Sequence, residues 1–320
     1  GDPKRIMLFG TSAGGGNICA LISSPLARGL FHAAAMESSV PTGCEIPTLA
    51  EVEGRTGQRV VKAVGCDSAA NVAACLRSKR TTEIVSAVPA GTNVFPRIYG
   101  PNMDGHVFPD QPLSIVARRA HTAMPIVIGN TTDETLGWVR SGTPITDAQT
   151  YSAEIEKVFG AGARERILAA YPLSSYATPA SAFIQLTTDA QFTCTSRRVA
   201  RVFAGAQKEP VYRYLFSHVM ENDPQLMAAG ANHTIEHAFL FPLRGSYEPT
   251  AADLTVQRFM VGYWTRLALT GTPNSGRDPQ WPVAAGDAYL ELNAAPAANR
   301  GPDRAKCDLW DSLPVQWPHL

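Results

Sequence analysis

Gly10-Thr11-Ser12-Ala13-Gly14 follows directly after the apolar run Ile6-Met7-Leu8-Phe9, close to the start of the chain. This is the pattern G-x-S-x-G between a short strand and a glycine-rich helix start, which is typical of a nucleophile elbow. Such a turn is tight, so we expect a Cβ at either flanking glycine to clash with neighbouring backbone. The turn raises the Ser12 hydroxyl above the sheet edge, beside a helix N-terminus whose free N–H groups favour negative charge.

Strands and helices alternate along the 320 residues. This alternation predicts an α/β fold with a mainly parallel central sheet flanked by helices, and the length indicates one large domain over 1–320. Strands are expected at 5–9, 31–36, 125–129, 211–216 and 289–292, and helices at 13–23, 50–64, 147–159, 180–203 and 253–270.

Charge and hydropathy exclude two classes of partner. Lys+Arg and Asp+Glu are both 28, so the net charge is zero. Without a basic stripe we expect no nucleic-acid binding. The longest apolar runs fall short of the length that a membrane-spanning helix needs, so no membrane span is expected.

Titratable side chains follow two of the expected strands. Asp133 and Glu134 leave the strand at 125–129, and His233 and His237 lie beyond the strand at 211–216. Ligands of open α/β sheets bind beyond the carboxyl ends of the strands. The order serine, acid, histidine is that of α/β-hydrolases and predicts acyl transfer by a serine nucleophile.

The same segment allows a second chemistry. His233-Thr234-Ile235-Glu236-His237 has the form H-x-x-E-H, a zinc-peptidase signature. Two histidines four apart on one helix face could bind Zn²⁺, with Glu236 as general base. No motif supplies a third ligand, so the zinc peptidase is kept as an alternative and the main interpretation includes no metal.

Several separated motifs resemble the type-B carboxylesterase and cholinesterase family of α/β-hydrolases. The matching segments are Gly1-Asp2-Pro3-Lys4-Arg5-Ile6, Gly129-Asn130-Thr131-Thr132-Asp133-Glu134, His233-x-x-Glu236-x-x-Phe239-Leu240-Phe241 and Tyr263-Trp264 through Gly271-Thr272-Pro273-Asn274. The resemblance implies a serine hydrolase of carboxylic esters that needs no cofactor. A non-catalytic cholinesterase-like binding protein or an inactive fragment is the other alternative.

The resemblance also implies roles for individual residues. Ser12 is the expected nucleophile, Glu134 the acid, His233 the base and the Ala13 N–H one oxyanion donor. Ser38 and Glu236 fall where the family has supporting residues around the histidine. Phe95, Trp138, Met227 and Phe239 are the candidates for lining a pocket for a small-molecule or polymer ester.

The family carries strands and a glycine-rich oxyanion loop before the elbow, and these are not in this chain. We therefore expect the chain to be the C-terminal portion of an α/β-hydrolase domain, with an N-terminal companion chain of the same protein. Thr11, Thr135 and Thr234 also depart from the family pattern, which affects packing around the triad more than its chemistry.

The six cysteines carry information about the cellular compartment of the protein. Cys66 and Cys75 bracket a short polar loop that suits a local disulfide, with buried thiols of a cytosolic protein as the alternative. The resemblance implies the disulfides Cys66–Cys75 and Cys194–Cys307, hence a secreted or periplasmic protein. It implies no partner for Cys19, and Cys44 is expected to pair outside this chain. Glycosylation sequons at Asn130 and Asn232, beside the expected triad, favour a bacterial source.

Overall fold

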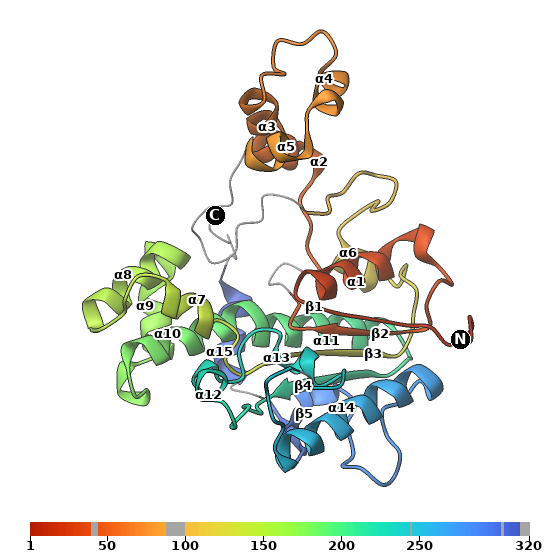
Figure 1. Ribbon diagram of the computed structural model, residues 1–320, viewed down its shortest axis with the longest axis vertical. Coiled ribbons are helices and arrows are strands. Elements are labelled where there is room, and N and C mark those ends of the chain that lie inside the picture. Colours follow the sequence, from red (N-terminus) through yellow and green to blue (C-terminus); the bar gives the residue numbers. More distant parts are fainter. Residues whose placement is uncertain (40–43, 88–99, 244, 302–303, 314–320) are drawn as a thin grey trace.

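A six-stranded sheet forms the centre of the computed structural model, which describes residues 1–39, 44–87, 100–243, 245–301 and 304–313 (Figure 1). The strands lie in chain order, β1 to β5 parallel and β6 antiparallel to β5. This confirms the predicted α/β fold. The strands are β1 Met7–Thr11, β2 Ala33–Glu37, β3 Ile126–Thr131, β4 Val211–Phe216, β5 Ala288–Leu292 and β6 Ala297–Arg300.

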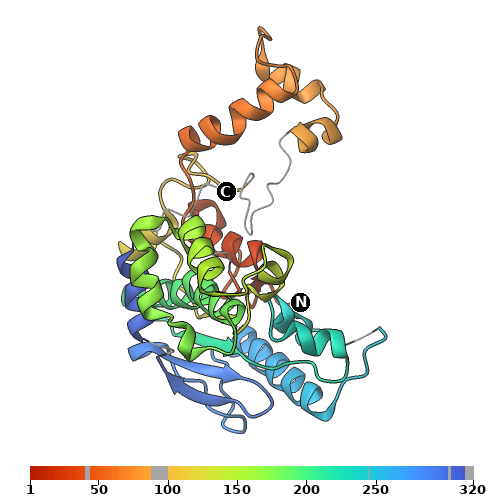
Figure 2. The ribbon, with the colours of Figure 1, turned by 90° about the vertical axis from the view of Figure 1, so that its left-hand side faces the viewer.

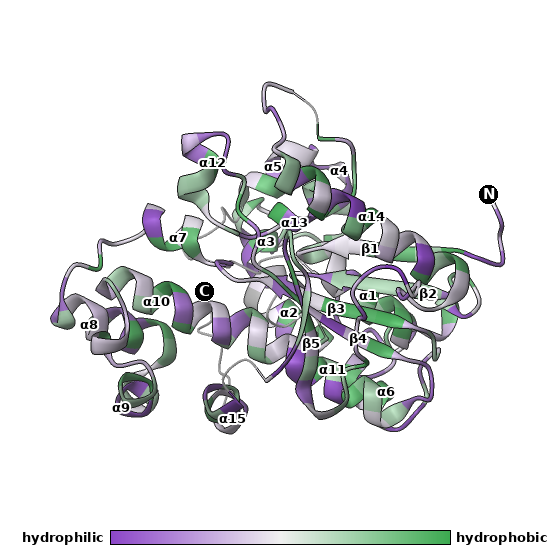
Figure 3. Ribbon diagram, turned by 90° about the horizontal axis from the view of Figure 1, so that it is seen from below, coloured by the Kyte–Doolittle hydropathy of each residue, from purple (hydrophilic) through white to green (hydrophobic). Residues whose placement is uncertain are grey.

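Helices cover both faces of the sheet, which is why the parallel strands are apolar throughout. Met36 and Ile128 pack on one side with α1, α6 and α11, whereas Ala35 and Val127 pack on the other with α14. Figure 3 shows α14 on one side of the sheet and α6 and α11 on the other. These helices are α1 Ala13–Ser23, α6 Pro112–Ala117, α11 Cys194–Ala206 and α14 Ala251–Thr270. The short helices α12 Pro224–Ala229 and α13 Ile235–Ala238 contribute Leu226 and Ile235 to the apolar cluster on the α14 side.

A third apolar cluster forms beside the sheet, where Tyr151, Phe183 and Trp310 pack together. Its helices are α7 Leu136–Ser141, α8 Ala148–Phe159, α9 Ala161–Ala170, α10 Pro179–Thr188 and α15 Arg304–Ser312. The expected helix at 180–203 is in fact two helices, because the π-helical turn η4 Asp189–Thr193 joins α10 to α11. Such turns widen a helix locally and are frequent at functional sites.

Four short helices project away from the sheet (Figures 1 and 2). They are α2 Leu49–Val52, α3 Gln58–Ala63, α4 Val72–Ser78 and α5 Thr81–Ala87. The expected helix at 50–64 corresponds to α2 and α3, joined by the π-helical turn η2 Glu53–Gly57. None of the helices in the described part of the chain combines the length and apolarity that a bilayer crossing needs.

The glycines of the elbow correct one expectation. A Cβ at Gly10 would lie 3.1 Å from the carbonyl carbon of Gly14, as predicted. A Cβ at Gly14 would meet no described atom within 4 Å, so the predicted clash there is wrong. The tight position is Gly15, whose Cβ would lie 3.1 Å from the main-chain oxygen of Glu37. Helix α1 therefore approaches the end of β2 through Gly15.

Candidate active site

Ser12 lies between β1 and α1 in a strained conformation. Its φ of 57° and ψ of −120° are rare for a residue with a side chain. The Ser12 N–H donates to the Glu37 carbonyl of β2 at 2.9 Å, and the side chain does not cap the helix. The hydroxyl is thereby free to face a partner from another loop.

Two loops at the carboxyl edge of the sheet are joined by Asp133. Its N–H donates to the Ala231 carbonyl and its Oδ2 accepts from the Ala231 N–H, each at 3.0 Å. Asp133 therefore holds the loop after β3 against the loop that carries His233. This arrangement leaves Glu134 beside the histidine.

Ser12, His233 and Glu134 form a continuous hydrogen-bonded chain. His233 Nε2 lies 2.8 Å from Ser12 Oγ, and Nδ1 lies 2.5 Å from Glu134 Oε2. The Glu134 side chain is fully buried, and its other oxygen accepts the Thr131 N–H at 2.8 Å. Because a carboxylate accepts at Nδ1, the imidazole presents Nε2 to the hydroxyl as an acceptor.

The N-terminus of α1 lies next to Ser12. Ala13 is the first residue of this 11-residue helix, it is exposed, and the first turn contains no acidic residue. Helix N-termini stabilise negative charge through their free N–H groups. The arrangement can therefore stabilise an oxyanion that forms next to Ser12.

Glu236 and Ser38 belong to one hydrogen-bonded group that joins α13 to the end of β2. The Ser38 hydroxyl donates to Glu236 Oε1, which also accepts from the Tyr214 hydroxyl at 3.2 Å. Glu236 is fully buried, and burial raises its pKa well above the ordinary value, with the Glu134 carboxylate raising it further. Burial likewise raises the pKa of Tyr214. The ring of Tyr214 fills the space over Gly129, where a Cβ would come within 2.2 Å of it.

The geometry of H-x-x-E-H does not suit zinc. Thr234 has a φ of 73°, so His233 precedes α13 and does not share a helix face with His237. His237 Nδ1 instead lies 2.6 Å from Glu37 Oε2, and Glu236 points to Ser38. Within the described residues, no three His, Cys, Asp or Glu side chains are grouped as metal ligands.

The four pocket candidates have different outcomes. Trp138 contacts the catalytic histidine candidate, with 4.9 Å between the ring centroids of Trp138 and His233. Met227 is 54% exposed on α12. Phe239 is fully buried against Phe216, so its expected pocket role is wrong because it presents no surface to a ligand. Phe95 lies outside the described residues.

Sequence reasoning missed Phe192. Its ring lies 5.2 Å from that of His233 and stacks on Trp138 at 6.4 Å, with 5° between the planes. Phe192 belongs to the π-helical turn η4. The extra residue of a π turn changes which side chains share a face, so helical periodicity could not have indicated this contact.

Three disulfides are present. Cys66–Cys75 and Cys194–Cys307 are the pairs that the resemblance implies. Cys19 and Cys44 form the third, so the expectation that Cys44 pairs outside the chain is wrong. Both residues lie in the core around α1, where their Cα atoms are 5.4 Å apart.

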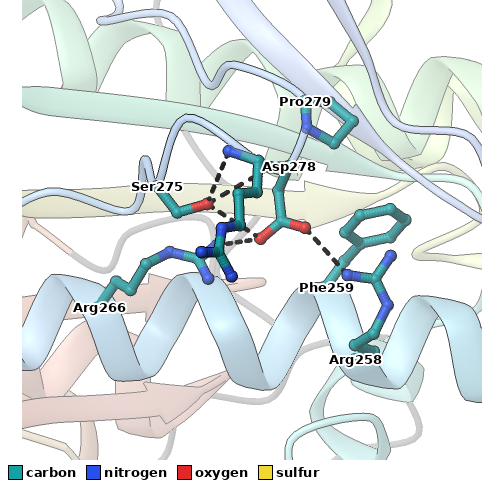
Figure 4. Close-up of a pocket in the computed structure, with 7 residues that line it drawn as sticks. Arg258, Phe259, Arg266, Ser275, Asp278 and Pro279 are labelled. Carbon is teal, nitrogen blue, oxygen red and sulfur yellow. Dashed lines mark hydrogen bonds and ion pairs between the residues drawn. The ribbon is translucent and has the colours of Figure 1, made fainter.

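A cavity of about 740 Å³ lies elsewhere, between α14 and the loop that follows it (Figure 4). Asp278 forms ion pairs there with Arg258 at 2.9 Å and Arg266 at 2.8 Å. Its charged groups thus largely pair with one another and hold the loop against the helix. None of the residues that line it belongs to the hydrogen-bonded chain at Ser12.

Comparison with known proteins gives the family context. The sequence matches the Carboxylesterase family over residues 1–310. It is 30% identical to Carboxylesterase 5A of Canis lupus familiaris over 98% of this chain and 58% of that protein. It is 28% identical to the medium-chain fatty acyl-CoA hydrolase precursor of Anas platyrhynchos, over 99% of this chain and 59% of that protein. Identity to the acylcarnitine hydrolase of Mus musculus is 28%, over 97% of this chain and 57% of that protein.

The chain thus spans somewhat more than half the length of these relatives. The relatives come from mammals and a bird, so they lend no support to the expected bacterial source.

Proposed function

This chain belongs to the carboxylesterase family, and from that premise we propose that it carries the catalytic triad of a serine hydrolase that cleaves carboxylic esters. The observation that carries the proposal is the unbroken chain of hydrogen bonds from Glu134 through His233 to Ser12. A non-catalytic binding protein would have no need for this arrangement. Family membership alone would be compatible with either a catalytic or a non-catalytic protein.

The residues act in two half-reactions. In the first, His233 Nε2 takes the proton of Ser12 Oγ as the oxygen attacks the ester carbonyl. The Ala13 N–H and the α1 N-terminus stabilise the tetrahedral oxyanion. The histidine then protonates the departing alcohol, which leaves an acyl-enzyme. In the second half-reaction, water attacks this acyl-enzyme with the same base, and Ser12 is restored. Glu134 fixes the imidazole tautomer throughout, and no step uses a cofactor.

The substrate we propose is an ester with an apolar acyl or alcohol group. Trp138 lies beside His233 and is partly exposed, so it can form one wall of the substrate site. Phe192 is fully buried behind it and fixes its orientation. Names among the relatives refer to fatty acyl-CoA and to acylcarnitine, which are small acyl compounds. We therefore favour a small-molecule ester over a polymer.

The site is completed, we propose, by a companion segment of the same protein along β1. Within the described residues β1 pairs only with β2, so its other edge is open. Phe9, on β1, and Phe241 are 37% and 49% exposed; their rings contact each other and the His237 ring. An open edge next to exposed aromatic rings favours strand addition. Such a segment would also bring further oxyanion donors.

The three disulfides favour an oxidising compartment. We propose a protein that is secreted or otherwise outside the cytoplasm. The bacterial source stays a prediction. It rests on the glycosylation sequons, of which the one at Asn130 is fully buried and leaves no room for a glycan.

A fluorophosphonate probe tests the proposed chemistry. We expect one adduct per chain, which peptide mass spectrometry locates on Ser12, because a hydrogen-bonded base makes this hydroxyl nucleophilic. EDTA should leave both labelling and ester hydrolysis unchanged. Loss of hydrolysis with the chelator would favour the zinc-peptidase alternative. The absence of an adduct on Ser12 would overturn the serine mechanism.

Photo-crosslinking tests the companion segment. With p-benzoylphenylalanine in place of Phe9, we expect a cross-link to a peptide of the same protein from outside residues 1–320. The matched control is the same substitution at Leu269 on α14, which is 51% exposed and should give no such product. Equal cross-linking at both positions, or none at Phe9, would contradict the proposal.

A further inference from the structure

Glu37 is a buried carboxylate with an unusual set of partners. It is the last residue of β2 and is fully buried. Its Oε2 lies 2.6 Å from His237 Nδ1, and its Oε1 accepts the indole N–H of Trp264 at 2.7 Å. Its main-chain oxygen accepts the N–H of Ser12 at 2.9 Å. One residue thus contacts the elbow, α13 and α14.

The next residue extends this connection. Ser38 donates its N–H to the Gly129 carbonyl at 2.8 Å, and its hydroxyl bonds Glu236. Glu236 and His237 are adjacent on α13, which begins two residues after His233. The end of β2 therefore holds α13 through the side chains of Glu37 and Ser38. It holds Ser12 through the main-chain oxygen of Glu37.

We propose that Glu37 is a positioning residue, which uses His237 and Trp264 to hold the elbow and α13 at the separation that proton transfer from Ser12 to His233 requires. The inference rests on the proposed function. In this proposal His237 is a structural partner of Glu37 and transfers no proton. Displacements of about 1 Å at reacting groups can cost about 10²-fold in rate, so a modest shift of α13 would be measurable.

Charge explains why the partner at position 237 is a histidine. The hydrogen bond to Glu37 raises the pKa of His237, which favours its charged form. Burial and the nearby Glu134 and Glu37 charges raise the pKa of Glu236, so these three acidic side chains lie close enough to affect one another. A cationic partner balances the Glu37 charge, since a buried carboxylate without one is costly.

The chain contains a matched pair that does not contact the elbow. His218 Nε2 lies 2.6 Å from Asp253 Oδ1, and both residues are buried. Asp253 completes the capping box of α14 by accepting the Thr250 N–H, and it also accepts from the Tyr247 hydroxyl. Like His237 and Glu37, this pair joins a histidine to a buried carboxylate, and it contacts the end of α13 through the ring of Phe239, with 5.5 Å between the ring centroids. It therefore serves as the control for a structural role that lacks the link to the end of β2.

The test compares Glu37→Gln, His237→Leu, His237→Asn and the control His218→Leu. The measurements are the second-order rate constant of fluorophosphonate labelling per folded molecule, and kcat and KM for p-nitrophenyl acetate. We expect Glu37→Gln and His237→Leu to lower both kcat and the labelling constant about tenfold, with KM within about twofold of wild type. The Asn side chain places an N–H donor where His237 Nδ1 lies but carries no charge, so His237→Asn should recover part of the rate.

The control separates positioning from general loss of stability. His218→Leu should lower Tm but leave the rate of the folded fraction unchanged. Equal rate losses in His218→Leu and His237→Leu would overturn the positioning role, as would wild-type rates in Glu37→Gln. A wild-type protein that the probe does not label would overturn the proposed function and the positioning role together. Normal wild-type labelling with unaffected variants would overturn the positioning role alone.

Discussion

Ser12→Ala should lower the hydrolysis of p-nitrophenyl acetate by about 10⁴-fold or more. Without the hydroxyl no acyl-enzyme forms, and His233 and the α1 N-terminus can only assist the direct attack of water. The measurement is the steady-state rate, with fluorophosphonate labelling as the second readout. The matched control is Ser114→Ala, which removes an exposed hydroxyl on α6 and should leave both readouts unchanged.

A second substitution at the same position adds a stability readout. Ser12 has a positive φ that glycine adopts without strain. Ser12→Gly should therefore be as inactive as Ser12→Ala, yet more stable than it by about 1 kcal/mol. Urea denaturation measures this difference. If the alanine variant keeps more than about a tenth of the wild-type rate, another group is the nucleophile and the proposed mechanism is wrong.

Removing the Cys194–Cys307 disulfide should cause the largest loss of stability. The two cysteines are 113 residues apart and join α11 to α15. Closing a loop of that length restricts the unfolded chain, so Cys194→Ala/Cys307→Ala should lower the free energy of unfolding by about 4–5 kcal/mol. Urea denaturation under oxidising conditions measures the change.

The control for this prediction is the short loop. Cys66 and Cys75 are only 9 residues apart, so Cys66→Ala/Cys75→Ala should cost about 2–3 kcal/mol. An equal or smaller loss for the long loop would contradict the argument from loop length. In that case other contacts would hold α15 in place, such as the ion pairs of Arg197 with Asp308 and Asp311.

Local sequence predicted the elements that position the candidate site. Helix α1 has the expected bounds, and β4 does too, because each is an apolar segment bounded by residues that end it. Strand β6, Ala297–Arg300, was missed. It is a short edge strand that is largely exposed, so its sequence carries no apolar alternation, and only its pairing with β5 defines it.

The order of Ser12, Glu134 and His233, with the motifs around them, was sufficient to identify the candidate triad before its geometry was known. Their types and their places after strand ends are local properties of the sequence. Their distances depend on the sheet, which brings together loops 221 residues apart for Ser12 and His233. The sequence could predict this convergence because parallel strands end at the same edge.

Tertiary structure alone decided which side chains surround the triad. Phe192 contacts His233 from a π-helical turn, Phe239 is buried, and Cys19 forms a disulfide with Cys44. The pairing of Glu37 with His237 joins residues 200 positions apart. Nothing local distinguishes a buried glutamate with partners from an exposed one. Burial and partner choice are properties of packed elements, because each depends on side chains that only the complete fold brings within contact.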